Sequence, residues 1–265
     1  MSVKKDTSDD AKQKKQHFLL YGFGKAGSTF IFDYLRHHKN FSTPAIKEPY
    51  FFNLNFSKGM KWYLSLFEIN EDTVGFGDFS NQNFRHNDTL INLKATFPKT
   101  KILILDRPPV DRLISARKFD LMNGSRQSIE SFIQEWPEEF LFSDYLRASI
   151  EKVMPGSEIL LVDFDDIVSD EDVALRNICD FIGIPFDSKK PDIQKNPSLV
   201  PRSEIFSGMA KQLAVLLRRA GFLRLLQLLK SSQLVRMMFH SEKKIHLSEE
   251  EMQKIGRYVR ESSKF

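Results

Sequence analysis

The segment that most constrains the fold is residues 17–30, where a short apolar run leads through a glycine-rich turn into a helix start. The run from Phe18 to Tyr21 has the length of a buried strand. Residues that permit tight turning or favour a helix N-terminus follow it, namely Gly22, Gly24, Gly27, Ser28 and Thr29. This order places backbone N–H groups around the positive end of a helix, which is an arrangement that binds phosphate or sulfate.

The turn differs from the loop that binds nucleoside triphosphates, which reads G-x-x-x-x-G-K-[ST]. Gly22 and Gly27 have that spacing, but Ser28 occupies the lysine position, and the lysine of the turn is Lys25. The run from Lys25 to Thr29 resembles the 5′-phosphosulfate loop of sulfotransferases that use 3′-phosphoadenosine 5′-phosphosulfate (PAPS). The resemblance implies that the phosphosulfate is bound by Gly24, Lys25, Ala26, Gly27, Ser28 and Thr29. The alternative is an ordinary strand–helix turn with a solvated lysine.

A second anion-binding pattern begins at Arg107, which follows Asp106 at the end of an apolar run, and includes Ser115 eight residues further on. An arginine fork and a serine hydroxyl can hold a phosphate with charge-assisted hydrogen bonds. The stretch resembles the 3′-phosphate motif of the same sulfotransferases, R-[ND]-P-x-x-R-x-x-S, except that Pro108 replaces the usual Asn or Asp. The resemblance implies that Arg107 and Ser115 hold the 3′-phosphate. The alternative is a helix start with surface arginines.

Transfer of a sulfuryl group to a hydroxyl or amine needs a base, and Glu48 is the first candidate. It resembles the glutamate before an aromatic pair that serves as the base in heparan-type sulfotransferases. The alternative is a rim glutamate paired with Lys47. His86, in a loop, is another candidate base, because the cytosolic aryl-type branch of the family uses a histidine. Asp78 is the third candidate.

Two weaker similarities concern the acceptor and the nucleotide. Residues 77–84 resemble a heparan-type segment, but Phe79 stands where that segment has a lysine, which argues against a sulfated polysaccharide acceptor. Residues 196–203 resemble a segment of several sulfotransferases in which Arg202 would close over the nucleotide, with a surface loop as the equal alternative.

Apolar runs and helical spacings alternate along the first 185 residues, which predicts a parallel sheet flanked by helices in three layers. We expect strands at 18–21, 73–79, 101–105 and 158–162, and helices at 31–38, 60–69, 88–97, 110–121, 128–135, 139–153, 170–182 and 247–261. The last helix is opened by the capping-box pattern Ser248-x-x-Glu251. Ligands of such sheets bind beyond the carboxyl ends of the strands. The loops after Tyr21, Phe76, Leu105 and Val162 should therefore share one crevice. The sulfotransferase resemblance implies a P-loop-like α/β fold with a helical C-terminal extension.

The chain of 265 residues is predicted to be a disordered basic tail (1–16) and one domain (17–265), with a helical C-terminal part from 206. Its formal net charge of +4 suits an anionic ligand. A single cysteine, Cys179, lies in an apolar helical pattern and is expected in the core. The first residues are polar and lysine-rich, without a signal peptide or a membrane span. We therefore expect a cytoplasmic protein.

The stretch 207–240 is rich in leucine and basic residues. It predicts either a helical hairpin that covers the sheet or, less favoured, a basic surface for peripheral membrane contact. Aromatic residues hint at an apolar or carbohydrate-stacking pocket, although aromatic side chains also fill cores: Tyr50, Phe51, Phe52, Trp62, Tyr63 and Phe79.

The sequence thus predicts a PAPS-dependent sulfotransferase, closer to the heparan-type and bacterial branch than to the cytosolic aryl branch. Lys25 would stabilise the leaving group and Glu48 would deprotonate a carbohydrate, lipid-like or small-molecule acceptor. No cluster has the spacing of metal ligands, so we expect neither a metal nor a nucleic-acid partner. The alternatives are a P-loop kinase or ATPase and a non-catalytic module that binds a nucleotide or a membrane. The acceptor and the oligomeric state stay open.

Overall fold

A computed structural model describes residues 14–81, 83–137, 142–189, 200–201, 240–241 and 245–263. The predictions for Arg202 and for most of 196–203 and 207–240 fall outside these residues. The chain divides into two compact units. The first unit comprises residues up to 107 together with 142–193, and the second comprises 108–141 and 194–265.

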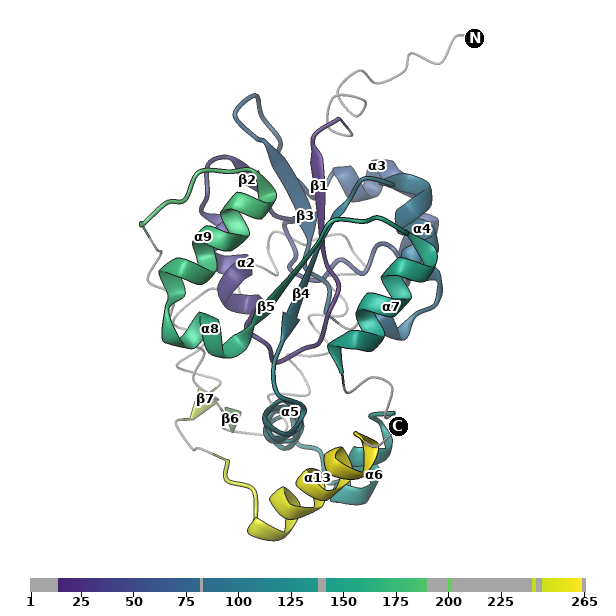
Figure 1. The fold of residues 1–265 in the computed structure, drawn as a ribbon, viewed down its shortest axis with the longest axis vertical. Helices are drawn as coiled ribbons and strands as arrows, with labels where there is room; N and C mark the ends of the chain where they lie inside the picture. The colour runs from purple at the N-terminus through teal and green to yellow at the C-terminus, as the bar shows by residue number, and fades with distance from the viewer. Residues whose placement is uncertain are drawn as a thin grey trace. The chain divides into compact units, whose positions relative to one another are not determined.

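The first unit is built on a five-stranded sheet whose strands all run parallel, as the alternation of strands and helices predicts (Figure 1). Its order is β2-β3-β1-β4-β5. The strands are β1 (Gln16–Leu20), β2 (Phe41–Ser42), β3 (Gly75–Asp78), β4 (Lys101–Asp106) and β5 (Ile159–Asp163). β1 lies in the centre of the sheet and begins two residues before the predicted strand, at the end of the predicted tail. The short β2 was not predicted, because two residues carry too little pattern.

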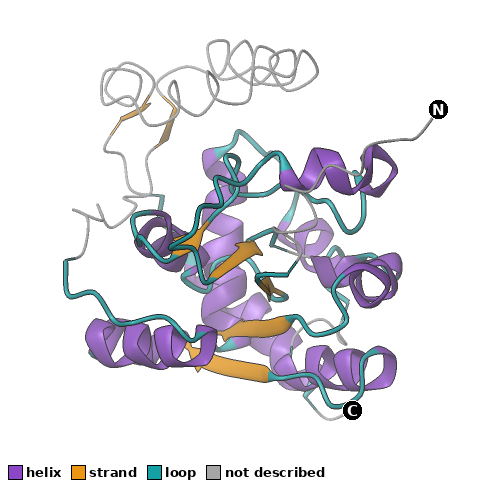
Figure 2. Ribbon diagram, turned by 90° about the horizontal axis from the view of Figure 1, so that it is seen from above, coloured by secondary structure: helices purple, strands orange, loops and turns teal. Residues whose placement is uncertain are grey.

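Helices cover both faces of this sheet, and Figure 2 shows the strands between helical layers. One face carries α2 (Ser28–Arg36), α8 (Phe164–Ser169) and α9 (Glu171–Ile182), and the other carries α3 (Gly59–Leu64), α4 (Asp88–Thr96) and α7 (Ser143–Val153) (Figure 1). Two short 3₁₀ helices lie at Phe56–Lys58 and Asn83–Arg85. α8 was not predicted; Asp163 precedes it, and Asp165 and Asp166 lie in its first turn, where their charges suit the helix dipole.

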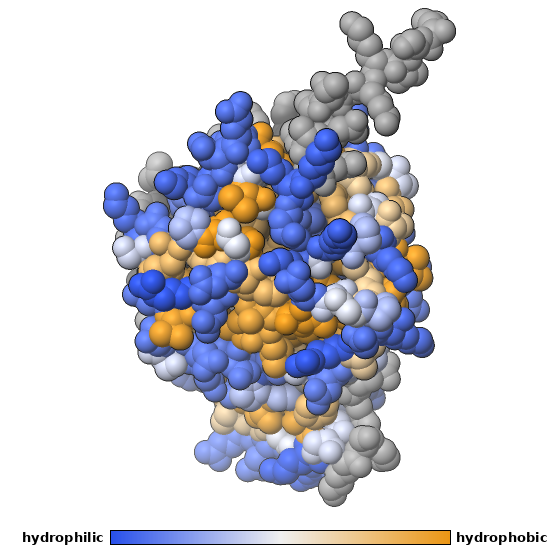
Figure 3. Space-filling view, turned by 45° about the horizontal axis from the view of Figure 1, so that its top comes forward, coloured by the Kyte–Doolittle hydropathy of each residue, from blue (hydrophilic) through white to orange (hydrophobic). Residues whose placement is uncertain are grey.

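Alternate residues of β1 point to opposite faces of the sheet and anchor two cores. Phe18 belongs to a buried cluster that includes Ile31, Leu103 and Cys179, so the prediction that the cysteine is in the core is confirmed. His17, next to Phe18, stacks on Phe97 with ring centroids 4.1 Å apart. At the surface, hydrophilic side chains surround an apolar area on the face that Figure 3 shows.

The second unit contains α5 (Pro109–Met122), α6 (Ile129–Gln134) and α13 (Glu249–Ser262), together with the antiparallel pair β6 (Val200–Pro201) and β7 (His240–Ser241). Arg117 of α5 joins two helices through an ion pair of 3.1 Å with Glu251 of α13. The predicted capping box of Ser248 and Glu251 starts α13 and is confirmed. Of the helices in the described part of the chain, none has the length and apolar character that a membrane-spanning helix requires.

Candidate active site

The turn after β1 leads to a helix N-terminus that is open to an anion. Gly27 precedes α2 with φ of 89°, in the left-handed region that favours glycine, and no side chain caps the helix. The first turn of α2 holds no acidic residue that would offset its positive end. A Cβ at position 27 would lie 3.2 Å from Ile167 and 3.3 Å from Phe164, so the turn fits closely against α8. The open helix end fits a phosphate or sulfate group.

Two lysines lie at this helix end, one from the turn and one from the segment after β2. The ammonium group of Lys47 donates hydrogen bonds to the hydroxyl oxygens of Ser28, at 3.2 Å, and Thr29, at 2.8 Å. Burial and repulsion from Lys47 together lower the pKa of Lys25 to about 8, against the opposing effect of Glu48. Burial also lowers the pKa of Lys47. Burial disfavours the charge of both ammonium groups, and Lys47 also disfavours that of Lys25, so an anion bound near them would stabilise their charged forms.

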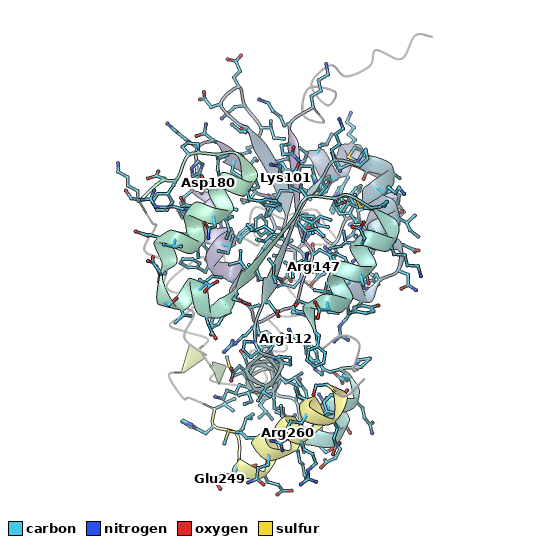
Figure 4. All side chains as sticks on the ribbon, viewed as in Figure 1. Lys101, Arg112, Arg147, Asp180, Glu249 and Arg260 are labelled. Carbon is cyan, nitrogen blue, oxygen red and sulfur yellow. The ribbon has the colours of Figure 1, made fainter. Side chains whose placement is uncertain are left out.

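Arg107 brings a third cation to the same turn from the end of β4. Its guanidinium donates a hydrogen bond of 2.9 Å to the backbone oxygen of Lys25 and lies 4.3 Å above the ring of Phe164. Lys101, which begins β4, marks the amino end of the sheet (Figure 4), so Arg107 lies at the opposite, carboxyl edge. Ser115, the predicted partner of Arg107, lies within α5 in the second unit.

Glu48 is held by two neutral donors. The hydroxyl group of Tyr50 donates to Oε2 at 3.1 Å, and the side-chain amide of Asn81 donates to Oε1 at 2.8 Å. Among the described residues, Lys47 forms its hydrogen bonds with the α2 hydroxyls and makes no ion pair with Glu48. The alternative of a glutamate paired with Lys47 therefore does not describe this geometry. Glu48 still interacts electrostatically with both Lys25 and Lys47.

The other two candidate bases lie in different environments. Asp78 ends β3, is fully buried, and accepts hydrogen bonds from the hydroxyl and the backbone N–H of Ser80 through Oδ1. Burial raises the pKa of Asp78 to about 7 against these hydrogen bonds, and Glu48 adds to the rise. His86 is exposed in the turn before α4.

Four of the six aromatic residues that hinted at a pocket fill the interior instead. Phe51 stacks on Tyr63 with centroids 4.4 Å apart, and both are fully buried with Phe52 on the α3 side of the sheet. Phe79 is buried in the other core between Phe18 and Phe32. The prediction of an aromatic pocket is therefore wrong for these four residues. The Phe79 side chain points into the core. Its presence where the heparan-type segment has a lysine therefore does not mean that the site has lost a cation.

Sequence reasoning missed the role of Lys47, which it treated only as a partner for Glu48. The one available signal was that a lysine adjoins a candidate base. The strand before it, β2, was too short to be predicted, and only the fold shows that the segment after β2 lies at the same edge of the parallel sheet as the turn after β1. Lys47 contacts Ser28 and Thr29 across 19 and 18 positions of sequence, so only the folded chain shows these contacts.

The parallel sheet and the cationic turn after its central strand define a P-loop-like α/β protein. The family model described as "Sulfotransferase domain" matches residues 15–206. This chain therefore belongs to the sulfotransferase family. The resemblance that the turn and the Arg107 motif carry is thus confirmed at the level of the family.

Similar proteins of known sequence support the prediction that the chain is closer to the heparan-type and bacterial branch of the family. The membrane-associated sulfotransferase kil1 of Dictyostelium discoideum is 29% identical over 108 residues, which are 40% of this chain and 23% of that protein. Heparan sulfate glucosamine 3-O-sulfotransferase 3A1 of Mus musculus is 22% identical over 189 residues, 66% of this chain and 48% of that protein. The chain thus spans less than half the length of either relative.

Among solved structures, the sulfotransferase of Alicyclobacillus acidocaldarius is similar in fold. The two superpose with a TM-score of 0.54 at 19% sequence identity, over 79% of this chain and 94% of that one. At this identity the likeness concerns the fold, and it supports the P-loop-like sheet described above.

Proposed function

We propose that this protein transfers a sulfuryl group from PAPS to a hydroxyl or amine group of an acceptor. The observation that carries the proposal is the convergence of Lys25, Lys47 and Arg107 on the open N-terminus of α2, with the carboxylate of Glu48 nearby. A donor with two separate anionic groups suits such a cluster, because each cation then gains a charge-assisted hydrogen bond.

The residues of the turn and the arginine motif have distinct roles in this proposal. The 5′-phosphosulfate is bound by the backbone and side chains of Gly24, Lys25, Ala26, Gly27, Ser28 and Thr29, with Lys47 as an additional cation. Arg107 and Ser115 hold the 3′-phosphate, and Arg202 closes over the nucleotide. PAPS supplies the sulfuryl group as a co-substrate, and the residues described here include no cluster of three or more side chains that could hold a metal ion.

Glu48 acts as the base in this reaction. It accepts the proton of the acceptor hydroxyl or amine as the acceptor atom bonds to sulfur and the bond from sulfur to the phosphate oxygen breaks. Lys25 and Lys47 stabilise the negative charge that develops on that phosphate oxygen. The leaving group is adenosine 3′,5′-bisphosphate. Glu48 takes the proton and the leaving phosphate oxygen takes the electron pair of the broken bond, so no further reactant is needed.

The donor is tested by the thermal stability of the full chain with each of two nucleotides. We expect adenosine 3′,5′-bisphosphate to raise the melting temperature and ATP with magnesium to raise it less, since stabilisation follows affinity for the folded state. Lys25→Ala should abolish the shift. A larger shift with ATP and magnesium would favour a kinase or an ATPase and would overturn the donor assignment.

Transfer is tested by the release of adenosine 3′,5′-bisphosphate from PAPS with a panel of acceptors. The panel contains a heparan-type oligosaccharide, because of the relative named above, together with a phenol, an aliphatic alcohol and a glycolipid. We expect turnover with at least one, and a loss of roughly a hundredfold or more in Glu48→Gln. Donor binding without transfer to any of them would favour a non-catalytic module, and wild-type turnover in Glu48→Gln would show that Glu48 is not the base.

A further inference from the structure

The Glu48 carboxylate is contacted on both oxygens by side chains from two different segments. Tyr50 reaches Oε2 from the segment after β2, and Asn81 reaches Oε1 from the loop after β3. One donor on each oxygen fixes both the position and the rotation of the carboxylate plane. Each oxygen has a further lone pair, so the carboxylate can still accept a proton.

The backbone of Tyr50 is held in a conformation that a residue with a side chain rarely adopts. Its φ is 48°, in the left-handed region. The backbone N–H of Tyr50 donates a hydrogen bond of 2.9 Å to the hydroxyl of Ser80, and that hydroxyl donates one of 2.6 Å to Asp78. Ser80 and Asp78 are both fully buried. Such strain persists where the surroundings fix it, and it concentrates at functional sites.

The charges around Glu48 explain why neutral donors suit this position. Lys25, Lys47 and Asp78 all interact electrostatically with Glu48. Lys47, its nearest neighbour in sequence, donates its hydrogen bonds to Ser28 and Thr29 instead. An ammonium group bonded directly to the carboxylate would make it a weaker base. A phenol and an amide orient the carboxylate without neutralising its charge.

We propose that Tyr50 and Asn81 are positioning residues that together orient the Glu48 carboxylate toward the acceptor. This inference rests on the proposed function, in which Glu48 is the base. The chain from Asp78 through Ser80 to the Tyr50 backbone keeps the tyrosine hydroxyl in place.

The test uses Tyr50→Phe and Asn81→Leu in the full chain, each of which removes one donor. Turnover is measured as release of adenosine 3′,5′-bisphosphate with the fastest acceptor of the panel above. We expect kcat to fall roughly tenfold at neutral pH, since a carboxylate that has lost one of its two donors is less often aligned with the acceptor proton. The KM for PAPS and the thermal shift with adenosine 3′,5′-bisphosphate should not change.

Asn55→Leu is the matched control, because Asn55 donates an equally short amide hydrogen bond of 2.8 Å, but to the backbone oxygen of Pro49. It should lower the melting temperature and leave kcat unchanged. A second readout does not depend on turnover. The ¹³C signal of the Glu48 carboxyl group, identified by its loss in Glu48→Gln, should have a different chemical shift at neutral pH in Tyr50→Phe and Asn81→Leu than in the wild type and Asn55→Leu.

Three outcomes separate the hypotheses. Wild-type kcat and ¹³C chemical shift in both variants would overturn the positioning role. An equal loss of kcat in Asn55→Leu would also overturn it, since general loosening of the segment would then explain the effect. Absence of transfer in the wild type, with the expected change in the ¹³C chemical shift, would overturn the proposed function and leave the orientation of Glu48 established.

Discussion

Raising the pH above neutrality should weaken the binding of adenosine 3′,5′-bisphosphate, because Lys25 then loses its charge. Burial and the nearby Lys47 lower the pKa of Lys25 to about 8. A bound phosphate favours the charged lysine, so binding above this pH requires the uptake of a proton. The phosphate groups have a second pKa of about 6 and keep a constant charge above pH 7.

The size of the effect follows from the fraction of charged lysine. At a pH one unit above the pKa, about one tenth of Lys25 carries a proton, so Kd should be about tenfold higher at pH 9 than at pH 7. Lys47, whose pKa is lowered in the same direction, can add to this loss. Isothermal titration calorimetry in buffers of different ionisation enthalpy measures both Kd and the number of protons taken up.

Lys25→Arg is the variant that isolates this contribution, since the guanidinium stays charged throughout the range. It should bind with a distinctly flatter pH dependence. A wild-type Kd that does not change between about pH 7 and 9 would refute the reasoning. The same slope in Lys25→Arg as in the wild type would refute the assignment to Lys25.

The structure also predicts the effects of substitutions at Gly27, His17 and Asp78 on stability or ligand binding. Gly27→Ala should abolish the thermal shift with adenosine 3′,5′-bisphosphate and lower the stability of the protein. Gly59→Ala is the control, because Gly59 has a similar φ of 78° and an added Cβ would have no atom within 4 Å. It should lower stability only by the backbone strain, roughly 1–3 kcal/mol. His17, whose pKa burial lowers to about 3, is neutral in the native state. The unfolded chain binds a proton there below pH about 6.5, so this group contributes a loss of about 1.4 kcal/mol of stability per pH unit on acidification, which urea unfolding should show as the difference in slope between the wild type and His17→Leu. Asp78, with its pKa raised to about 7, has the opposite sign. Its contribution is present at low pH and lost as the pH rises through about 7, and Asp78→Asn should not show that loss.

Much of the fold could be predicted because its signals are local. Apolar runs of strand length, helix caps and glycines at helix ends lie within a few residues of the elements they define. The turn before α2 and the capping box of α13 were found in this way. α8 was missed because its six residues offer less than two turns of helical periodicity, and because the two acidic residues of its first turn, Asp165 and Asp166, also suit a turn between elements.

The environment of each side chain could not be read in the same way. Phe79 and Tyr50 are both aromatic residues in irregular or strand-end segments, yet one fills the core and the other bonds to Glu48. The difference depends on which face of the sheet each residue meets, and sequence spacing does not give this across a loop. Lys47 was placed beside Glu48 by sequence, whereas the fold directs its ammonium group to the hydroxyls of α2.

The central claim, two separate anion sites for one donor, is tested most directly by comparing adenosine 3′,5′-bisphosphate with adenosine 5′-monophosphate, which lacks the 3′-phosphate. Calorimetry should show the wild type binding the bisphosphate at least tenfold more tightly, roughly the value of one charge-assisted hydrogen bond. Arg107→Ala should lose most of this preference, and Lys25→Ala should weaken both ligands alike. Equal affinity of the wild type for the two nucleotides, or an unchanged preference in Arg107→Ala, would contradict the account.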